Sequence, residues 1–300
     1  MNSTPQQLHI PVLLEEVLAV LNPQSGESYL DLTAGMGGHA RKVIERIGDA
    51  KLATLCDRDS FAISQLKDIE KQGATLIHQD YEHAVTDLKA SGARFDMILL
   101  DLGVSSPQLD RGERGFSFSH DGPLDMRMDN RQELTAATIV NTYPEKELAR
   151  IFSEYGEIGR HQSEELAREI CYQRKRQRFD STQDLAEVVR IEVGRLDHGK
   201  YHHVHPATQV FQALRIAVND ELGQLERTLP QLDDILNSGG RLAIITFHSL
   251  EDRIVKHYLK ENSGSLDLPY TLIMKKPIAG NVNDYNPRAR SAKLRAACKK

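Results

Sequence analysis

The chain has 300 residues, a formal net charge of −5 and 40% hydrophobic residues, which excludes a disordered or fibrous protein. Its length allows one large globular domain or two modest ones. The N-terminal residues are polar and lack an apolar signal-peptide core, and no apolar run has the length of a membrane span, about 18 residues. We therefore expect a cytoplasmic protein without a membrane partner.

The cysteines, Cys56, Cys171 and Cys298, are odd in number and form no C-x-x-C pair. This spacing argues against a disulfide framework or a zinc ribbon, and it suits a reducing cytosol.

Strand-length apolar runs alternate with helical patterns through the first hundred residues. The runs are nearly continuous in apolar character, which is typical of a parallel sheet covered on both faces. The predicted helices are Pro11–Leu21 and Asp59–Lys71. The predicted strands are Tyr29–Leu32, Lys51–Cys56, Ala74–His78 and Phe95–Leu100, with a fifth at Arg241–Phe247. This order predicts an α/β fold of the doubly wound, Rossmann-like kind.

The segment between the fourth and fifth strands is too long for a loop and shows helical patterns without a strong strand. We expect an inserted helical subdomain at 111–213, within a core made of 1–110 and 214–300. Its clearest helices are Pro144–Tyr155, Glu164–Arg178 and Thr182–Arg195. The core then continues with helices Asn219–Leu236 and Leu250–Glu261, a last strand Tyr270–Lys275 and a basic tail.

A glycine-rich turn follows the first predicted strand, in Asp31-Leu32-Thr33-Ala34-Gly35-Met36-Gly37-Gly38-His39. Glycines at Gly35 and Gly37 let the backbone turn tightly and approach a ligand, and the helix that follows offers free N–H groups. Dinucleotide enzymes carry G-x-G-x-x-G, whereas this turn lacks the third glycine at that spacing. It is more similar to the first motif of S-adenosylmethionine (SAM) methyltransferases, although a purely structural turn is the alternative.

Two further strand ends supply candidate cofactor ligands. Asp57 closes the second strand, where a carboxylate can accept both ribose hydroxyls of an adenosine. The alternative is a solvated aspartate, and nearby Asp59 could instead cap the next helix. Tyr81 follows the third strand, where it could stack on adenine or be an ordinary core or surface tyrosine.

The loop from Asp101 to Asp110 follows the fourth strand, at the sheet edge where ligands of open α/β folds bind. An amino nitrogen of cytosine is a weak nucleophile, so acceptors such as the Asp101 carboxylate could orient it and stabilise developing charge. Amino-methyltransferases often carry Pro-Pro and an aromatic residue here, which this loop lacks. Phe116 and Phe118 are the nearest aromatic residues that could stack on a base.

Several sequence blocks, in order along nearly the whole chain, resemble the RsmH (MraW) family of bacterial 16S ribosomal RNA (cytosine-N4)-methyltransferases. These blocks are Asp101 to Asp110, Glu113 to Phe118, Asp121 to Met128, His205 to Thr208, Phe211 to Ile216, Phe247 to Arg253 and Asn286 to Ser291. The resemblance implies a Rossmann-like SAM-dependent methyltransferase that methylates N4 of a cytosine in the decoding centre, within the small ribosomal subunit. It further implies that Gly37, Gly38 and His39 line the SAM site, with Asp57 on the ribose and Tyr81 near the adenine. Asp101 and Gln108 would complete the pocket near the methionine end. The stretch between Glu261 and Asn286 is short beside some relatives.

Basic segments supply candidate RNA contacts, because lysine and arginine bind phosphate. The candidates are Arg174, Lys175 and Arg176 in one run, and Arg288 and Arg290 near the C-terminus. The alternatives are a solvated helix face for the first run and a frayed tail for the second.

The histidines His198, His202, His203 and His205 lie close in sequence, but no cysteine or spaced acidic set completes a metal site, and methyl transfer needs no metal. We therefore expect no metal. His248, at the end of the fifth strand, could act as a base or be structural. The sequence leaves open a homodimer, a DNA amino-methyltransferase and a SAM-binding ribosome-assembly factor without useful turnover.

Overall fold

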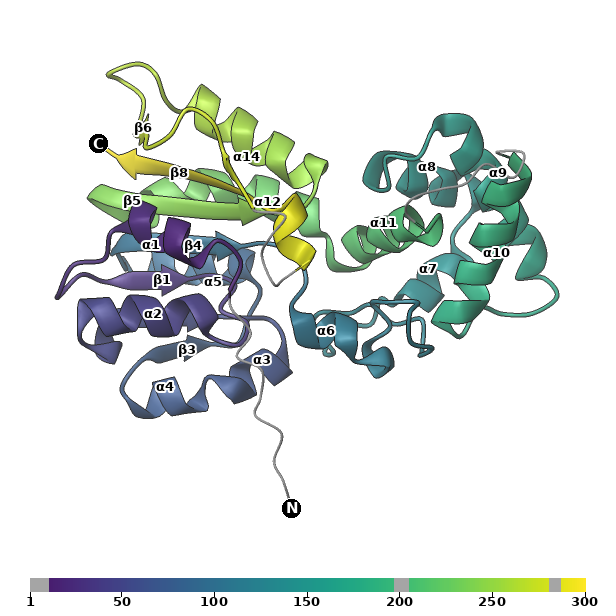
Figure 1. Cartoon of the computed structure of the whole chain (residues 1–300), viewed down its shortest axis with the longest axis horizontal. Coiled ribbons are helices and arrows are strands. Elements are labelled where there is room, and N and C mark those ends of the chain that lie inside the picture. Colours follow the sequence, from purple (N-terminus) through teal and green to yellow (C-terminus); the bar gives the residue numbers. More distant parts are fainter. Residues whose placement is uncertain (1–10, 197–204, 281–286) are drawn as a thin grey trace. The chain divides into compact units, whose positions relative to one another are not determined.

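The computed structural model describes residues 11–196, 205–280 and 287–300. The chain forms two compact units (Figure 1): unit 1 comprises Met1–Gly103 and Leu222–Lys300, and unit 2 comprises Val104–Glu221. Among the described residues, no helix combines the length and the apolar character needed to cross a membrane.

Unit 1 is built on one sheet whose strands follow the order β3-β2-β1-β4-β5-β8-β6, with β7 paired to β8. The strands are β1 (Tyr29–Asp31), β2 (Ala53–Cys56), β3 (Thr75–Ile77), β4 (Phe95–Asp101), β5 (Leu236–Thr246), β6 (Tyr270–Leu272), β7 (Ile278–Ala279) and β8 (Lys293–Lys299). Strands β1 to β5 pair in parallel, as predicted, with Asp31 in register with Leu55 and Leu99. The carboxyl ends of β1, β2 and β4 therefore meet at one edge.

Helices cover both faces of this sheet (Figure 1), which explains why its strands are apolar on both sides. One face packs against α1 (Leu14–Leu21), α2 (Gly38–Ile47) and α4 (Lys67–Lys71). The other face packs against α5 (Tyr81–Ala90), α12 (Glu221–Thr228), α13 (Leu232–Ile235) and α14 (Ser249–Glu261). Residues that alternate along β4 supply the two cores, with Met97 and Leu99 on one face and Ile98 and Leu100 on the other.

Two predicted helices of unit 1 are interrupted. The expected helix Asp59–Lys71 is split into α3 (Ser60–Gln65) and α4, because the Leu66 N–H bonds to Ile63 O and so tightens the turn. The expected single helix Asn219–Leu236 is wrong, because the structure has α12, a 3₁₀ turn and α13 in its place. Asp220 adopts a left-handed φ of 48°, and the 3₁₀ turn η3 (Leu229–Gln231), which contains Pro230, separates α12 from α13. Strand β5 then starts at Leu236, and Gly239 lies inside it instead of stopping a helix.

The predicted basic tail is a central strand. The helical turn η4 (Pro287–Ser291) leads into β8, which lies between β5 and β6 and runs antiparallel to both. Its cations are partly used inside the protein: Lys293 and Arg295 bind the Asp252 carboxylate at 3.0 and 2.8 Å. The sequence interpretation missed β8 because its alternating pattern of small apolar and basic residues does not resemble a buried parallel strand.

We expect Asp252→Ala to lower the free energy of unfolding by about 2 kcal/mol, since it leaves two cations beside a largely buried site without their partner. Burial alone would raise the pKa of Asp252, but hydrogen bonds from Arg295 and Lys293 lower it, so the carboxylate is ionised in the folded protein. Urea denaturation measures the change. Lys256→Ala, at an exposed position of the same helix, is the control and should cost less than about 0.5 kcal/mol.

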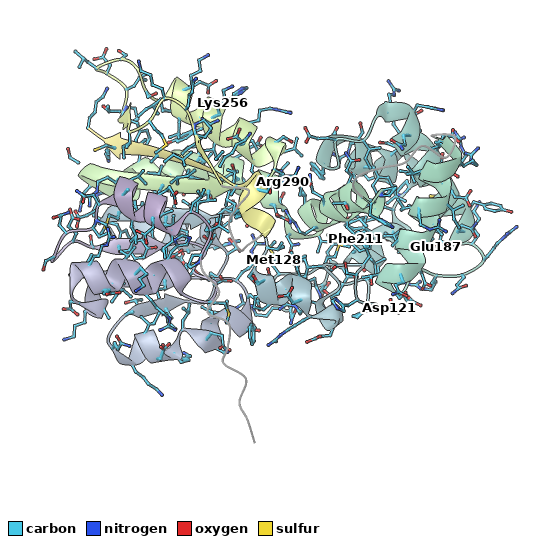
Figure 2. All side chains as sticks on the ribbon, in the orientation of Figure 1. Asp121, Met128, Glu187, Phe211, Lys256 and Arg290 are labelled. Atoms are coloured by element: carbon cyan, nitrogen blue, oxygen red, sulfur yellow. The ribbon has the colours of Figure 1, made fainter. Side chains whose placement is uncertain are left out.

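Unit 2 is helical around its own hydrophobic core. Its elements are α6 (Ser106–Asp110), η2 (Gly112–Arg114), α7 (Ala136–Thr142), α8 (Glu145–Tyr155), α9 (Arg160–Gln173), α10 (Thr182–Leu196) and α11 (Ala207–Asn219). Met128 and Phe211 belong to this core (Figure 2). The two aromatic side chains that could stack on a base, Phe116 and Phe118, pack against the core of unit 2. Phe116 is buried, and the ring of Phe118 packs against Phe211 with centroids 5.0 Å apart.

Candidate active site

The glycine-rich turn after β1 has the tight geometry that its sequence predicts. Gly35 and Gly37 have φ angles of 53° and 76°, and Gly37 N–H bonds to Ala34 O at 2.8 Å. A side chain at Gly37 would also collide, since its Cβ would lie 2.7 Å from Leu66 Cδ2. The Cβ of a residue at Gly38 would overlap the ring of Pro11. These glycines are therefore required by the packing of the turn itself, apart from any ligand.

Asp57 ties this turn to the end of β2. Its carboxylate accepts Gly35 N–H at 2.7 Å and Asp59 N–H at 2.8 Å, so both oxygens orient backbone of the site. Burial raises the pKa of Asp57. The side chain keeps some exposure, and each oxygen retains a second lone pair, so binding of ribose hydroxyls stays a prediction. Asp59 caps α3 by accepting Phe61 N–H at 2.9 Å, as the alternative for that residue expected.

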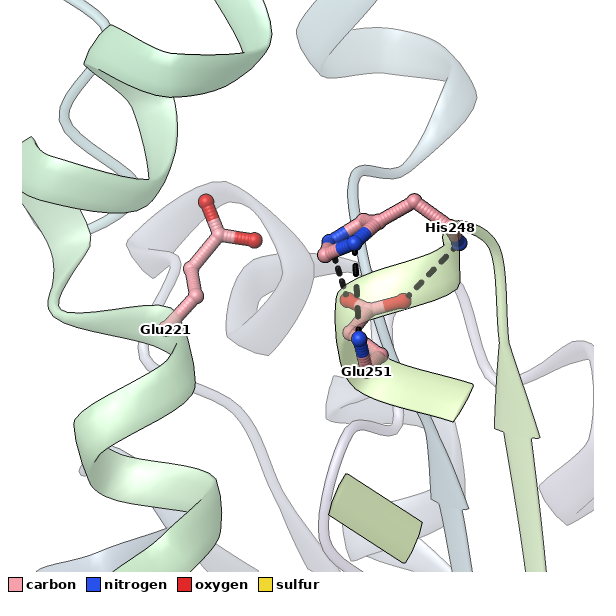
Figure 3. A group of neighbouring side chains, drawn as sticks. All are labelled: Glu221, His248 and Glu251. Carbon is pink, nitrogen blue, oxygen red and sulfur yellow. Dashed lines mark hydrogen bonds and ion pairs between the residues drawn. The ribbon is translucent and has the colours of Figure 1, made fainter. Parts of the chain in front are cut away.

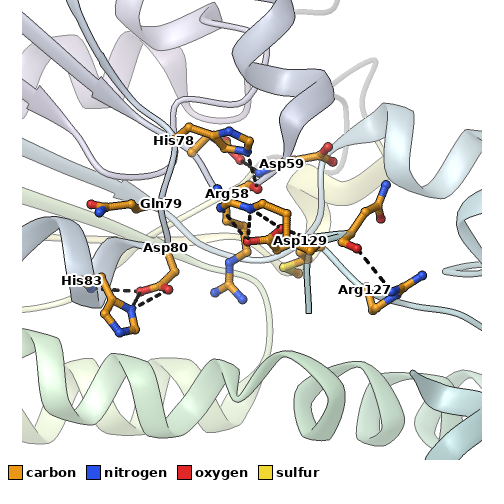
Figure 4. Close-up of polar contacts among 12 residues, drawn as sticks. Arg58, Asp59, His78, Gln79, Asp80, His83, Arg127 and Asp129 are labelled. Carbon is orange, nitrogen blue, oxygen red and sulfur yellow. Dashed lines mark hydrogen bonds and ion pairs between the residues drawn. The ribbon is translucent and has the colours of Figure 1, made fainter. Parts of the chain in front are cut away.

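Tyr81 lies in the core at the start of α5. Its side chain is 6% exposed and packs within the cluster on that face of the sheet, and the guanidinium carbon of Arg58 lies 5.8 Å from its ring centroid. The ring is therefore part of the core, and its contact with adenine stays a prediction. The adjacent Asp80 caps α5 and binds His83 Nδ1 at 2.7 Å, and the ring of His78 contacts Arg58 O (Figure 4).

Asp101 ends β4 beside the glycine-rich turn. Its N–H donates to Thr33 Oγ1 at 2.6 Å, and its Oδ2 lies 3.6 Å from His39 Nε2. Oδ1 of Asp101 and both ring nitrogens of His39 are buried without a hydrogen-bond partner among the described residues. Unpartnered buried polar atoms are costly, so this edge of the sheet offers hydrogen-bonding capacity that a polar ligand could use.

Asp31, at the end of β1, is buried at 1% exposure behind these groups. It accepts Tyr29 OH at 2.9 Å and Thr33 N–H at 3.1 Å. Burial raises the pKa of Asp31 to about 6, although the charge of His39 and the bond from Tyr29 counteract part of that rise. The first strand end therefore holds an aspartate that titrates close to neutral pH.

This raised pKa predicts a pH dependence of stability. Asp31 has a pKa of about 6 in the folded protein, whereas the ordinary pKa of an aspartate, which applies to the unfolded chain, is 3.8. The folded protein therefore binds this proton more tightly, and the free energy of unfolding falls as pH rises from about 4 to about 6. Asp31→Asn lacks this fall. We expect the variant-minus-wild-type difference to increase by about 3 kcal/mol across that range. Denaturant titrations at a series of pH values measure it, and parallel curves for the two proteins would contradict the prediction.

Gln108 and the basic run Arg174 to Arg176 lie in unit 2, whereas Arg288 and Arg290 lie on η4 in unit 1. Gln108 is buried in α6, where its side chain accepts Ser105 N–H at 2.9 Å in a capping box. This local role does not test its predicted contact with SAM. Arg174 is held inside unit 2, donating to Val140 O and Tyr143 O at 2.8 and 2.7 Å. That use favours a structural role for Arg174 over RNA contact.

The other predicted RNA contacts differ in their surroundings. Lys175 and Arg176 are exposed, and Arg176 stacks on the exposed ring of Tyr172 with its guanidinium carbon 4.4 Å from the centroid. Arg290 is exposed on η4 (Figure 2), whereas the side chain of Arg288 lies outside the described residues. RNA contact by these residues remains a prediction. Of the clustered histidines, His198, His202 and His203 also lie outside the described residues.

His248 caps α14 at the end of β5. Its Nδ1 accepts Glu251 N–H at 3.5 Å and its Nε2 lies 3.1 Å from Glu251 Oε1 (Figure 3). Glu251 Oε2 in turn accepts Phe247 N–H at 2.8 Å. Nδ1 thus has a structural contact, whereas the buried Nε2 has no hydrogen-bond partner among the described residues, so both alternatives for His248 stay open. Glu221, also drawn there, belongs to unit 2 and binds Arg215 at 2.9 Å.

Comparison with known proteins decides the family. The family model described as the MraW methylase family matches residues 6–300. The chain belongs to the MraW methylase family. Two curated relatives carry the name "Ribosomal RNA small subunit methyltransferase H". The one from Synechocystis is 46% identical over 297 residues, covering 96% of this chain and 92% of its own length. The one from Rickettsia canadensis is 46% identical over 312 residues, covering 97% and 98%.

Among solved structures, an rRNA methylase from Streptococcus thermophilus aligns with a TM-score of 0.41 and 11% identity, covering 100% of this chain and 98% of its own. This likeness is too distant to bear on the function of a MraW methylase. The family match agrees with the Rossmann-like methyltransferase fold predicted from the sequence and with the parallel-dominated sheet of unit 1.

Proposed function

We propose that this protein is a SAM-dependent methyltransferase of small-subunit ribosomal RNA, and that its acceptor is the exocyclic N4 amine of a cytosine in the decoding centre of 16S rRNA. The observation that carries this proposal is the match to the methylase family from residue 6 to residue 300, together with relatives named as ribosomal RNA small subunit methyltransferases that align over nearly their whole length. The cytosine and its position rest on the ordered sequence blocks alone.

The residues at the carboxyl edge of the sheet fit SAM. The turn at Gly35–His39 and the Asp57 carboxylate suit an adenosine, since Asp57 retains lone pairs for ribose hydroxyls beside backbone it already orients. The buried Oδ1 of Asp101, for which the described part of the chain offers no hydrogen-bond partner, suits a cationic or hydrogen-bonding group. When bound, SAM supplies an electrophilic methyl group on a sulfonium.

The chain's own contribution to the reaction is orientation and charge stabilisation. The lone pair of a cytosine amine is delocalised into the ring, so the amine must be held in line with the methyl group. Asp101 ends β4 at a fixed position, because its N–H is bonded to Thr33 and β4 lies between two parallel strands. A carboxylate there can accept an amine N–H and stabilise positive charge that develops on nitrogen. Unit 2 would recognise the RNA through its exposed cations.

The test is transfer of a labelled methyl group from SAM to small ribosomal subunits from cells that lack this protein. Naked rRNA and duplex DNA serve as parallel substrates, and mass spectrometry identifies the modified nucleoside. N4-methylcytidine in 16S rRNA is the expected product. Preferential labelling of duplex DNA would replace the proposal with a DNA amino-methyltransferase. Intact SAM binding without labelling of any substrate would point to a non-catalytic assembly factor.

A further inference from the structure

Three ionisable side chains converge on the carboxyl edge of the sheet in unit 1, and together they form what we call the Asp31–His39–Asp101 cluster. Asp31 and His39 are 1% and 6% exposed, and the Asp101 side chain is 26% exposed. They come from β1, the first turn of α2 and the end of β4. Two carboxylates and one imidazole thus share a site that is largely shielded from water.

The cluster holds no permanent positive charge. Neither Asp31 nor Asp101 has a lysine or arginine ion-pair partner among the described residues, and the cation available to them is a protonated His39. Tyr29 from β1 and Cys56 from β2 also interact electrostatically with the cluster. Burial beside Asp31 and Asp101 raises the pKa of Tyr29 well above its usual range, and burial among carboxylates that include Asp31 does the same for Cys56. Two nearby carboxylates in a shielded site repel one another, so the cluster gains stability from a proton.

His39 lies beside Asp101 without a hydrogen bond to it. Its Nε2 is 3.6 Å from Asp101 Oδ2, beyond hydrogen-bond distance, and neither ring nitrogen has a hydrogen-bond partner among the described residues. Within the same part of the chain Asp101 Oδ1 also lacks a partner, so it is able to receive a cation from outside. A positive charge placed on Asp101 would stabilise the ionised carboxylates of the cluster.

We propose that cofactor binding releases a proton from the Asp31–His39–Asp101 cluster, because the α-ammonium group of the cofactor's methionine moiety takes over the positive charge that the proton supplies in the free protein. This inference rests on the proposed function, which places the methionine end of SAM at Asp101. The proton leaves to the buffer, and the ammonium group binds beside Asp101 in its place. Cofactor affinity should therefore rise with pH, because at higher pH the cluster has already lost the proton that binding must displace.

The test is isothermal titration calorimetry with S-adenosylhomocysteine (SAH) in two buffers of different ionisation enthalpy, which gives the number of protons released per ligand bound. At about pH 6 we expect release of more than about 0.3 proton, since a carboxyl with the pKa of Asp31, about 6, holds about half a proton there. 5′-Methylthioadenosine keeps the adenosine and lacks the amino acid, so its binding should release fewer than about 0.1 proton.

Two matched aspartate variants locate the source of the proton. Asp31→Asn should reduce the release with SAH by at least half, whereas Asp68→Asn should leave it unchanged, because Asp68 is exposed and bound to Arg41. Thermal unfolding checks that both variants are folded. Should Asp31→Asn not fold, Tyr29→Phe removes the donor to Asp31 and should move the pH of maximal release upward.

The outcomes separate this inference from the proposed function. SAH binding without proton release, equal release with 5′-methylthioadenosine, or unchanged release in folded Asp31→Asn would overturn the proton coupling and leave the proposed function standing. Absence of any SAH binding by the wild-type protein would instead remove the proposed function, and the coupling with it.

Discussion

Replacing Asp101 with asparagine is expected to lower kcat/KM for methyl transfer to small ribosomal subunits about a thousandfold, with the protein still folded. The substitution keeps the shape of the side chain and the backbone bond to Thr33. It removes the negative charge of the carboxylate, whose Oδ1 has no hydrogen-bond partner among the described residues. Both proposed uses of that charge, binding an ammonium and stabilising a developing positive charge on the amine, are lost together. Methyl incorporation under single-turnover conditions and SAH affinity by calorimetry measure the two effects separately.

Asp96→Asn is the matched control, because Asp96 lies at the opposite end of the same strand. Its carboxylate is fully used in structural bonds, accepting Ser28 N–H and Oγ–H at 2.8 Å and the side-chain amide of Asn237 at 2.8 Å. We expect this variant to lose about 1–3 kcal/mol of stability and to retain activity per folded molecule within about twofold. If Asp101→Asn behaved like Asp96→Asn, the carboxylate of Asp101 would be structural and the proposed reaction centre would be misplaced.

Much of unit 1 was predictable because each of its signals is local. A parallel strand buried on both faces is nearly continuous in apolar residues, and the turn after β1 needs glycine at Gly37, where φ is 76° and a Cβ would strike Leu66. The polar residue that ends a strand, Asp57 or Asp101, is then placed at the ligand-binding edge by topology alone.

What could not be predicted depends on contacts between distant segments. Strand β8 is alternating and basic, and only its pairing with β5 and the ion pairs to Asp252 make it a central strand. Arg174 has the same sequence environment as Lys175, yet it turns inward because two carbonyl groups of unit 2, Val140 O and Tyr143 O, lie within its reach. The proximity of Asp101 to Asp31 and His39 likewise becomes apparent only when β1, α2 and β4 are brought together.

Because Arg174 points into unit 2, the prediction of RNA contact by this basic run rests on Lys175 and Arg176, which are exposed. We expect the double reversal Lys175→Glu and Arg176→Glu to lower kcat/KM on small subunits several hundredfold at low salt, mainly through KM, because two phosphate-binding charges become repulsive. The effect should shrink as salt is added, and the slope of log(kcat/KM) against log salt should become shallower by about 2. Initial rates across a salt series measure both quantities.

The charge-matched control is Lys67→Glu with Lys71→Glu, which reverses two exposed lysines of α4 in unit 1 and changes the net charge by the same amount. If the basic run of unit 2 contacts RNA at specific phosphates, the two double variants must differ at equal ionic strength. If instead only the net charge of the protein governs its attraction to the subunit, both variants lose activity equally, because both change the net charge by the same amount. SAH affinity should stay unchanged in both, since neither pair lies at the carboxyl edge of the sheet. Equal losses in the two variants would thus remove the basic run that follows α9 as an RNA-binding element, while leaving the methyl-transfer site of unit 1 intact.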